Sequence, residues 1–136
     1  MKMREYTRLE TLALLRRLSL QVERTADSPD EDAVHDLRVS VRRLSRCLRI
    51  FGPFYAGGRG QKFRSRLREL MAPAGAVRDI DIAMDLMSQA GFPPHSAIII
   101  RLAAARREKG RILAEVVRRW RRRRLRQWSR KLGMPL

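Results

Sequence analysis

The sequence predicts an all-α protein, an antiparallel four-helix bundle with one kinked arm and a long basic C-terminal helix. Apolar residues recur every three or four positions through most of the chain, which is the spacing of one face of an α-helix. Proline and glycine punctuate this pattern at a few breaks, namely residues 28–31, 52–60, 73–75 and 91–94. The arms between these breaks have similar lengths, and equal arms joined by short turns are typical of a helical bundle.

The first expected helix covers residues 3 to about 25, and we assign it a packing role because its charged positions mix both signs. The tetrapeptide Ser28-Pro29-Asp30-Glu31 follows, with a serine that can cap a helix, a proline suited to its first position and a glutamate at the capping-box position. A second helix is therefore expected to start at Pro29 and to end before Gly52. The glycine-rich stretch 52–60 is expected to be a mobile loop, and it matches neither common phosphate-binding pattern.

Two shorter segments, 61–72 and 77–90, are expected to form the kinked arm, because Pro73-Ala74-Gly75 interrupts the helical pattern between them. Within the first of these segments, Arg64 and Arg68 share an outward edge, since residues four apart lie on the same side of a helix. The pair adds to the basic character of this arm.

The last helix is expected to begin near Pro94 and to keep one apolar face until about Trp120. From about residue 121 the apolar register is lost and a basic tail begins. The segment 118–131 could bind RNA or DNA, or it could lie on a membrane through Trp120 and Trp128. It could equally be a partly frayed helix end that only adds to the general positive field.

Length and composition restrict the function classes. Residues 1–136, of which 44% are hydrophobic, make one folded domain that is too small to divide into two. The net charge of +17 attracts polyanions such as nucleic acid, inorganic polyphosphate or an anionic membrane surface. Almost all the basic residues are arginines, whose planar guanidinium group suits phosphate oxygens. No stretch is apolar enough to span a membrane, so a cytoplasmic location is expected.

The clearest functional signal lies in residues 35–49. On a helix, one histidine and four arginines of this stretch fall within an arc of about 80°, opposite an apolar stripe that faces the core. These residues are His35, Arg38, Arg42, Arg46 and Arg49. Like charges four residues apart each cost roughly 0.2–0.5 kcal/mol, so a bound anion would stabilise the helix. We predict an anion-binding face, and the alternative is a solvated charged surface.

The chemistry that the sequence offers is binding rather than catalysis. His35 and His95 are the only histidines, and the single cysteine, Cys47, leaves both of them without a pair of thiol ligands for zinc. No acidic cluster suits Mg²⁺, and no serine or cysteine is placed beside a histidine and an acid as a nucleophile. We therefore expect no enzymatic activity, no metal and no cofactor. Next to a dense anion, His35 should act as a further cation at mildly acidic pH.

A second polar motif is Arg78-Asp79-Ile80-Asp81. Its two carboxylates could serve the N-terminus of the helical segment that they open. Alternatively, Asp79 or Asp81 could hold an arginine of residues 35–49 in a fixed rotamer, while Arg78 joins the basic surface. Both interpretations are compatible with the pattern.

Together, two motifs resemble the CHAD domain, an all-helical family named for its histidine on an α-helix. They are His35-Asp36-x-Arg38-Val39-x-x-Arg42-Arg43-Leu44-x-Arg46 and Arg78-Asp79-x-Asp81-Ile82. The resemblance covers roughly residues 5–120 and implies binding of inorganic polyphosphate through a basic helical surface, without catalysis. It also allows an association with polyphosphate granules. By position, the phosphate contacts would be His35, Arg38, Arg42, Arg43, Arg46 and Arg78, with Asp79 and Asp81 as orienting partners, and Arg49 extends the row.

The sequence departs from the family in containing one bundle, where members typically have two that face each other across a basic cleft. Either the chain carries half of that surface, or two copies pair as a homodimer. The interface candidates for such a homodimer are Phe54, Tyr55, Leu125 and Trp128. Nothing resembles the E-x-E-x-K strand of the triphosphate-cleaving domain that is often fused to the family, so no enzymatic association is expected.

The alternative function is a nucleic-acid-binding helical module that uses the same arginine row and the C-terminal tail. Recognition of bases favours aromatic or amide side chains interleaved with basic ones. The basic face of residues 35–49 has none. This composition favours a bare phosphate chain.

Overall fold

The computed structural model describes residues 2–123 and 125–134, and the described residues form helices and turns with no strand. The all-α class expected from the apolar periodicity is therefore confirmed. The long helices are α1 (Met3–Asp27), α2 (Glu31–Ile50), α3 (Arg59–Gln89) and α4 (Ala97–Arg122). Two single-turn 3₁₀ helices, η1 (Gly52–Phe54) and η2 (Ala56–Gly58), connect α2 to α3, and a short α5 (Leu125–Lys131) follows α4.

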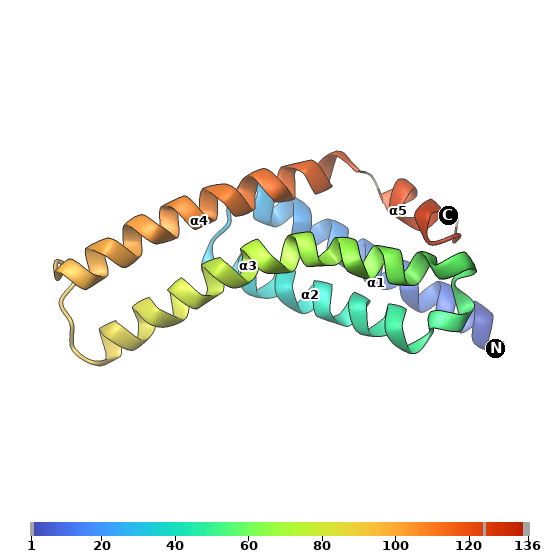
Figure 1. Cartoon of the computed structure of the whole chain (residues 1–136), viewed down its shortest axis with the longest axis horizontal. Coiled ribbons are helices and arrows are strands. Elements are labelled where there is room, and N and C mark those ends of the chain that lie inside the picture. The colour runs from blue at the N-terminus through green and yellow to red at the C-terminus, as the bar shows by residue number, and fades with distance from the viewer. Residues whose placement is uncertain (1, 124, 135–136) are drawn as a thin grey trace.

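The four long helices pack in cyclic order, because α1 contacts α2 and α4, while α3 contacts α2 and α4. Each helix contributes fully buried leucines to one shared core, among them Leu15, Leu37, Leu70 and Leu113. Both termini lie at one end of the molecule, and the hairpin of α3 and α4 extends past α1 and α2 at the other end (Figure 1). The fold therefore has a packed body and a protruding helical hairpin.

The third helix is continuous, in place of the two segments expected from the sequence. α3 passes through Pro73 without leaving helical geometry. Proline removes one backbone donor and crowds the preceding turn. Leu70, Ala74 and Val77, on either side of Pro73, are fully buried. Packing on both sides of the proline therefore holds the helix together where local sequence predicted a break.

The start of α2 also differs from the expectation. Asp30 is the N-cap, and its side-chain oxygen accepts a hydrogen bond of 2.8 Å from the Ala33 amide. Ser28, the expected cap, instead ends α1, because its amide donates to the Arg24 carbonyl oxygen at 3.0 Å. Aspartate caps a helix about as well as serine. In this short turn, Ser28 therefore ends α1 and Asp30 caps α2. As a result, α2 begins two residues later than expected.

The loop between α2 and α3, expected to be mobile, forms two 3₁₀ turns and contacts the core through Tyr55. Tyr55 is 4% exposed, and its hydroxyl lies 2.6 Å from the Thr11 hydroxyl of α1. Burial is the main cause that raises the pKa of Tyr55 above its ordinary value. Gly57 and Gly58 adopt positive φ angles of 52° and 70°, which the turn into α3 requires and which glycine tolerates best.

The C-terminal segment folds back onto the body, so the interpretation of a frayed basic tail is wrong for its described residues. Trp128 of α5 is 1% exposed and lies edge-to-face with Trp120, with ring centroids 5.6 Å apart. α5 packs against α1. Neither tryptophan is available to a membrane surface. None of the described helices has the length and apolar character of a membrane span.

The same packing removes most of the interface residues expected for a homodimer. Tyr55 and Trp128 belong to the core, and Leu125 is partly buried against it. Phe54 is only half-buried, in the first 3₁₀ turn. If two copies associate, a different surface must form the contact.

Candidate functional site

A strongly basic groove lies between α2 and α3. It has a volume of about 260 Å³, and five arginines line it. Three of them come from α2 and two from α3: Arg42, Arg46, Arg49, Arg64 and Arg68. Its remaining lining residues are uncharged: Val41, Ser45, Leu67 and Met71. Among the described residues, no carboxylate lines the groove.

The amphipathic patterns of both helices explain why the arginines meet. In α2, Val41 and Leu44 face the core, and the arginine row lies on the neighbouring flank of the helix. In α3, Leu67 is buried while Arg64 and Arg68 lie on the flank beside it. Because α2 and α3 pack against each other along their apolar faces, these two flanks form opposite walls of one groove.

The positive charge of the groove is not neutralised from within the described part of the chain. None of its five guanidinium groups forms an ion pair there, whereas carboxylates pair with arginines elsewhere, as in Arg24–Asp36 and Arg106–Asp81. The Nε atom of Arg64 is buried, and no described residue forms a hydrogen bond with it. Unpaired donors converging on a hollow are the arrangement that an oxyanion would satisfy.

Arg38 continues the arginine row one turn before Arg42. It is half-buried, and its Nε atom also has no partner in the described structure. Burial chiefly, and then repulsion from Arg42 and Arg78, lower the pKa of Arg38, while the charge of Asp79 opposes this shift. The basic surface therefore extends from the groove along α2 and reaches α3 again at Arg78.

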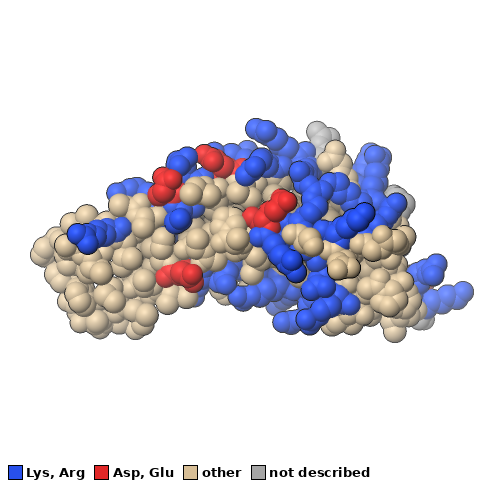
Figure 2. All heavy atoms as spheres, viewed as in Figure 1, with Lys and Arg blue, Asp and Glu red and all other residues tan. Residues whose placement is uncertain are grey.

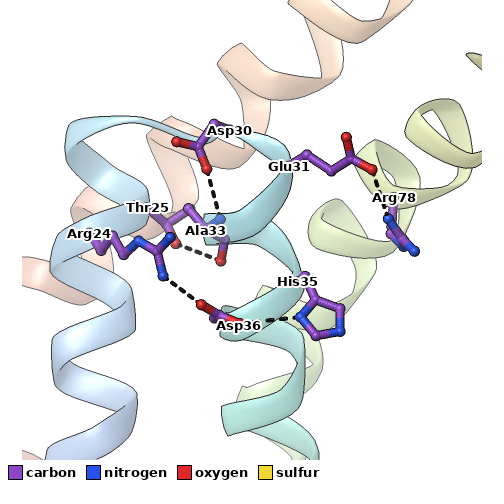
Figure 3. Close-up of polar contacts among 8 residues, drawn as sticks. All are labelled: Arg24, Thr25, Asp30, Glu31, Ala33, His35, Asp36 and Arg78. Atoms are coloured by element: carbon purple, nitrogen blue, oxygen red, sulfur yellow. Dashed lines mark hydrogen bonds and ion pairs between the residues drawn. The ribbon is translucent and has the colours of Figure 1, made fainter. Parts of the chain in front are cut away.

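His35 lies at the end of this row, on the surface. Its Nδ1 atom is 3.2 Å from a carboxylate oxygen of Asp36, and the other oxygen of Asp36 accepts a 2.5 Å hydrogen bond from Arg24 of α1 (Figure 3). The hydrogen bonds from His35 and Arg24 lower the pKa of Asp36. The histidine is thus tied to an ion pair that joins α1 to α2, with 58% of its side chain exposed.

Arg78 is partly neutralised, in contrast to the groove arginines. Its guanidinium lies 3.3 Å from the Glu31 carboxylate at the start of α2 (Figure 3). The negative charge of Asp85 is the main cause that raises the pKa of Glu31, followed by burial and by the charge of Asp81. Arg78 therefore connects the arginine row to a small acidic region rather than lining the groove.

The two expected orienting carboxylates separate in the structure. Asp81 is 8% exposed and accepts a 2.9 Å hydrogen bond from Nε of Arg106, which belongs to α4 rather than to α2. Arg106 also donates to the Pro29 carbonyl oxygen at 2.7 Å. Asp81 thus fixes the junction of three helices instead of an arginine of the row. Asp79 is exposed, and its charge acts on Arg38.

The expected contact residues therefore fall into three groups. Those that line the groove are Arg42, Arg46 and Arg49. Those that extend the basic surface beyond it are Arg38, Arg78 and His35. Arg43 is exposed outside the groove, about 100° around α2 from Arg42, on the side that also carries Asp36 and Cys47, which contact Arg24 and Thr11 of α1. Arg64 and Arg68 were not among the expected contacts, although their spacing of four residues indicated a shared edge.

The lining determines what the groove can do chemically. It supplies several guanidinium donors and one hydroxyl, that of Ser45. In the described residues, no group of three or more His, Cys, Asp or Glu side chains is placed to hold a metal ion. Multipoint binding of an oxyanion is the chemistry that these groups support directly.

Comparison with known proteins assigns the chain to a family. A family model described as the CHAD domain matches residues 11–135, which is nearly the whole chain and includes both walls of the groove. Neither the comparison with curated proteins nor that with solved structures finds a match. The match covers α2, α3 and α4 in full and α1 from residue 11 onward. The chain belongs to the CHAD domain family.

Proposed function

We propose that this protein binds inorganic polyphosphate in the groove between α2 and α3, without transforming it. The observation that carries the proposal is the convergence of five arginines on one hollow that no carboxylate lines. The family to which the chain belongs is associated with polyphosphate binding. A linear phosphate chain carries charge on every unit, so it can pair with successive arginines on both walls.

The length of the arginine row, which runs through the groove and beyond it to Arg38, suits an extended ligand better than a single phosphate. From Arg38 to Arg49 the row covers 11 residues, or about 16 Å of helix. Arginines four residues apart are separated by about 6 Å along it. A single phosphate can contact only one or two such side chains at once. A flexible chain of phosphates can follow the whole row, and each added contact increases its affinity.

Nucleic-acid binding is the alternative function. What supports it is a second basic surface near the end of α4, where Arg118, Arg119, Arg121 and Arg122 are exposed. The groove lining contains no aromatic, Asn or Gln side chain that could stack on or read a base. Trp120 and Trp128 are buried and cannot serve as stacking platforms. These features favour polyphosphate over nucleic acid in the groove itself.

Matched arginine variants test the groove assignment. We expect Arg46→Ala and Arg68→Ala each to weaken polyphosphate binding about tenfold, because each removes a charge-assisted contact of about 1–2 kcal/mol. Arg17→Ala removes the same charge from the exposed side of α1 and should change affinity less than twofold. The measurement is a titration of labelled long-chain polyphosphate. Equal losses in all three variants would show that only net charge counts and that the groove is not the site.

Competition separates polyphosphate from nucleic acid. Labelled polyphosphate bound to the protein is displaced with unlabelled polyphosphate or with random single-stranded DNA, at equal phosphate concentration and several salt concentrations. We expect polyphosphate to compete better at every salt concentration. DNA that displaces it equally well would favour the alternative. Release of orthophosphate during a long incubation would contradict binding without transformation.

A further inference from the structure

The protruding hairpin of α3 and α4 has an apolar surface that the rest of the chain does not cover. Five large apolar side chains are exposed there, with exposed fractions between 41% and 56%. They are Ile82, Leu86, Phe92, Ile98 and Ile100. Together with the turn that joins the two helices, they define the hairpin tip, residues 82–105.

The hairpin tip is also electrically neutral. It contains one acidic residue, Asp85, one arginine, Arg101, and one histidine, His95, which is counted as neutral in the chain's net charge of +17. In Figure 2 the Lys and Arg side chains gather over the body, and the end formed by the hairpin is almost free of charged side chains on the face shown. Polyanions and acidic proteins therefore have little to bind at the tip. Its chemistry suits a partner surface that is apolar and uncharged.

The tip extends well beyond the rest of the body. Glu31, at the start of α2, contacts α3 at Arg78. From Arg78 to Gln89 the helix continues for 11 residues, or about 16 Å. Ions at physiological strength screen charge with a Debye length of about 8 Å. The roughly 16 Å of α3 beyond Arg78 corresponds to about two Debye lengths. If two copies met at their tips, the repulsion between their basic bodies would therefore be strongly reduced.

The exposed apolar area is a substantial part of what self-association needs. A side chain of this size exposes roughly 200 Å² when it is fully in water. The five exposed fractions then amount to about 500 Å², spread around the hairpin, because Ile98 and Ile100 lie two residues apart on different sides of α4. Stable interfaces bury about 800 Å² on each partner. The neighbouring Pro93 and Pro94 are also exposed, and Met84 and Met87 are partly exposed, so they add to the area that a contact can bury.

We propose that the hairpin tip is a self-association surface through which two copies of this chain pair about a two-fold axis. A second copy is the occupant because it offers an identical neutral, apolar surface. Pairing would form a contact of four helices, two from each copy. α3 is continuous from Arg68 in the groove to Leu86 in the tip. Each groove would therefore be held at a fixed position relative to the dimer axis.

The test is the oligomeric state of the purified full chain at physiological salt, without any polyanion. We expect sedimentation velocity and light scattering to show a dimer. Leu86→Glu combined with Ile98→Glu should give a monomer, because burying two carboxylates at the contact would be costly. Leu9→Glu combined with Leu20→Glu is the matched control, since these leucines are 46% and 65% exposed on α1. The control should remain a dimer.

Circular dichroism of both variants keeps the experiment interpretable. All four leucine and isoleucine positions are at least 44% exposed, so we expect unchanged helix content. If the tip variant loses helix content, Ile82→Gln combined with Leu86→Gln repeats the test with a milder change. A wild-type chain that stays monomeric would overturn the proposal. Dissociation of the α1 control would also overturn it, and so would a monomer that binds uncharged lipid vesicles only when the tip is intact.

Discussion

Arginine side chains in this protein occur in two electrostatic settings. Arg24 and Arg106 are paired with carboxylates and join different helices. Arg42, Arg46 and Arg68 line a groove in which the described residues provide no carboxylate. A paired arginine stabilises the fold, because its charge and donors are satisfied within it. An unpaired arginine beside others of its kind is repelled by them, and that repulsion is relieved when an anion binds.

Asp36 gives a pH-dependent prediction at this scale. Hydrogen bonds from His35 and Arg24 lower its pKa in the folded protein below the ordinary value of 3.8. The ionised carboxylate therefore stabilises the fold fully above pH 3.8, and this contribution is lost as the pH falls through the lowered pKa. We expect the difference in unfolding free energy between wild type and Asp36→Asn to shrink as the pH falls from about 6 to about 2.

Urea unfolding of both proteins at several pH values measures that difference. Glu115→Gln is a suitable control, because it neutralises an exposed carboxylate that pairs only along α4. A difference for Asp36→Asn that stays constant across the range would show that its carboxylate has the same pKa in both states.

The sequence located part of the groove but not all of it. The arginine row of α2 follows from helical spacing alone, so Arg42 and Arg46 could be predicted. Arg64 and Arg68 could not be assigned, because which flank of α3 faces α2 depends on how the two helices pack. Position in the family motif placed Arg43 with the others, yet it lies towards α1. Matching a motif identifies residue types and their order along the chain. Whether a side chain lines the groove depends instead on its angular position around the helix.

At the scale of elements, tertiary packing overrode local signals in two places. Pro73 predicted a break, but buried residues on both sides of it keep α3 continuous. The arginine-rich composition after Trp120 left open a tail that binds nucleic acid, lies on a membrane or is a partly frayed helix end. Trp128 and Leu132, four residues apart on one face, were the available signal, and both are 1% exposed. A short helix with only two or three apolar anchors is hard to recognise among many charges.

The junction of α2, α3 and α4 gives a prediction at this scale. Asp81 of α3 accepts from Arg106 of α4, and Arg106 also donates to the Pro29 carbonyl ahead of α2. We expect Asp81→Asn to lower the free energy of unfolding by about 3 kcal/mol, because Arg106 would keep a half-buried charge without its counterion. Asp79→Asn, two residues earlier and exposed, is the control and should have a much smaller effect.

Chemical denaturation followed by circular dichroism measures both variants. A small effect of Asp81→Asn, similar to that of the control, would mean that Arg106 does not depend on this carboxylate. In that case the junction would be held mainly by apolar packing. The expected order of effects follows from burial, since Asp81 is 8% exposed.

At the scale of the whole molecule, charge and apolar surface are segregated along the long axis. The body carries the arginine groove, and the hairpin tip carries exposed apolar side chains with a net charge of zero (Figure 2). Such segregation allows two association reactions with different driving forces. The groove acts through electrostatic attraction, which salt weakens. The tip acts through apolar burial, and salt reduces the repulsion between the two basic bodies.

Salt should therefore move the two reactions in opposite directions. For single-stranded polyanions, the logarithm of the affinity falls with the logarithm of salt by about 0.7 for each charge contact. Five arginines in the groove give a slope of about −3.5, so affinity should fall about 100-fold between 50 and 200 mM salt. The double variant Arg46→Ala with Arg68→Ala should reduce the slope by about 1.4.

Over the same range of salt concentration, dimerisation of the polyanion-free chain should stay constant or strengthen. Titration and sedimentation on one protein preparation measure both. A flat salt dependence of binding would contradict the groove, and a dimer that dissociates as salt rises would contradict the apolar tip.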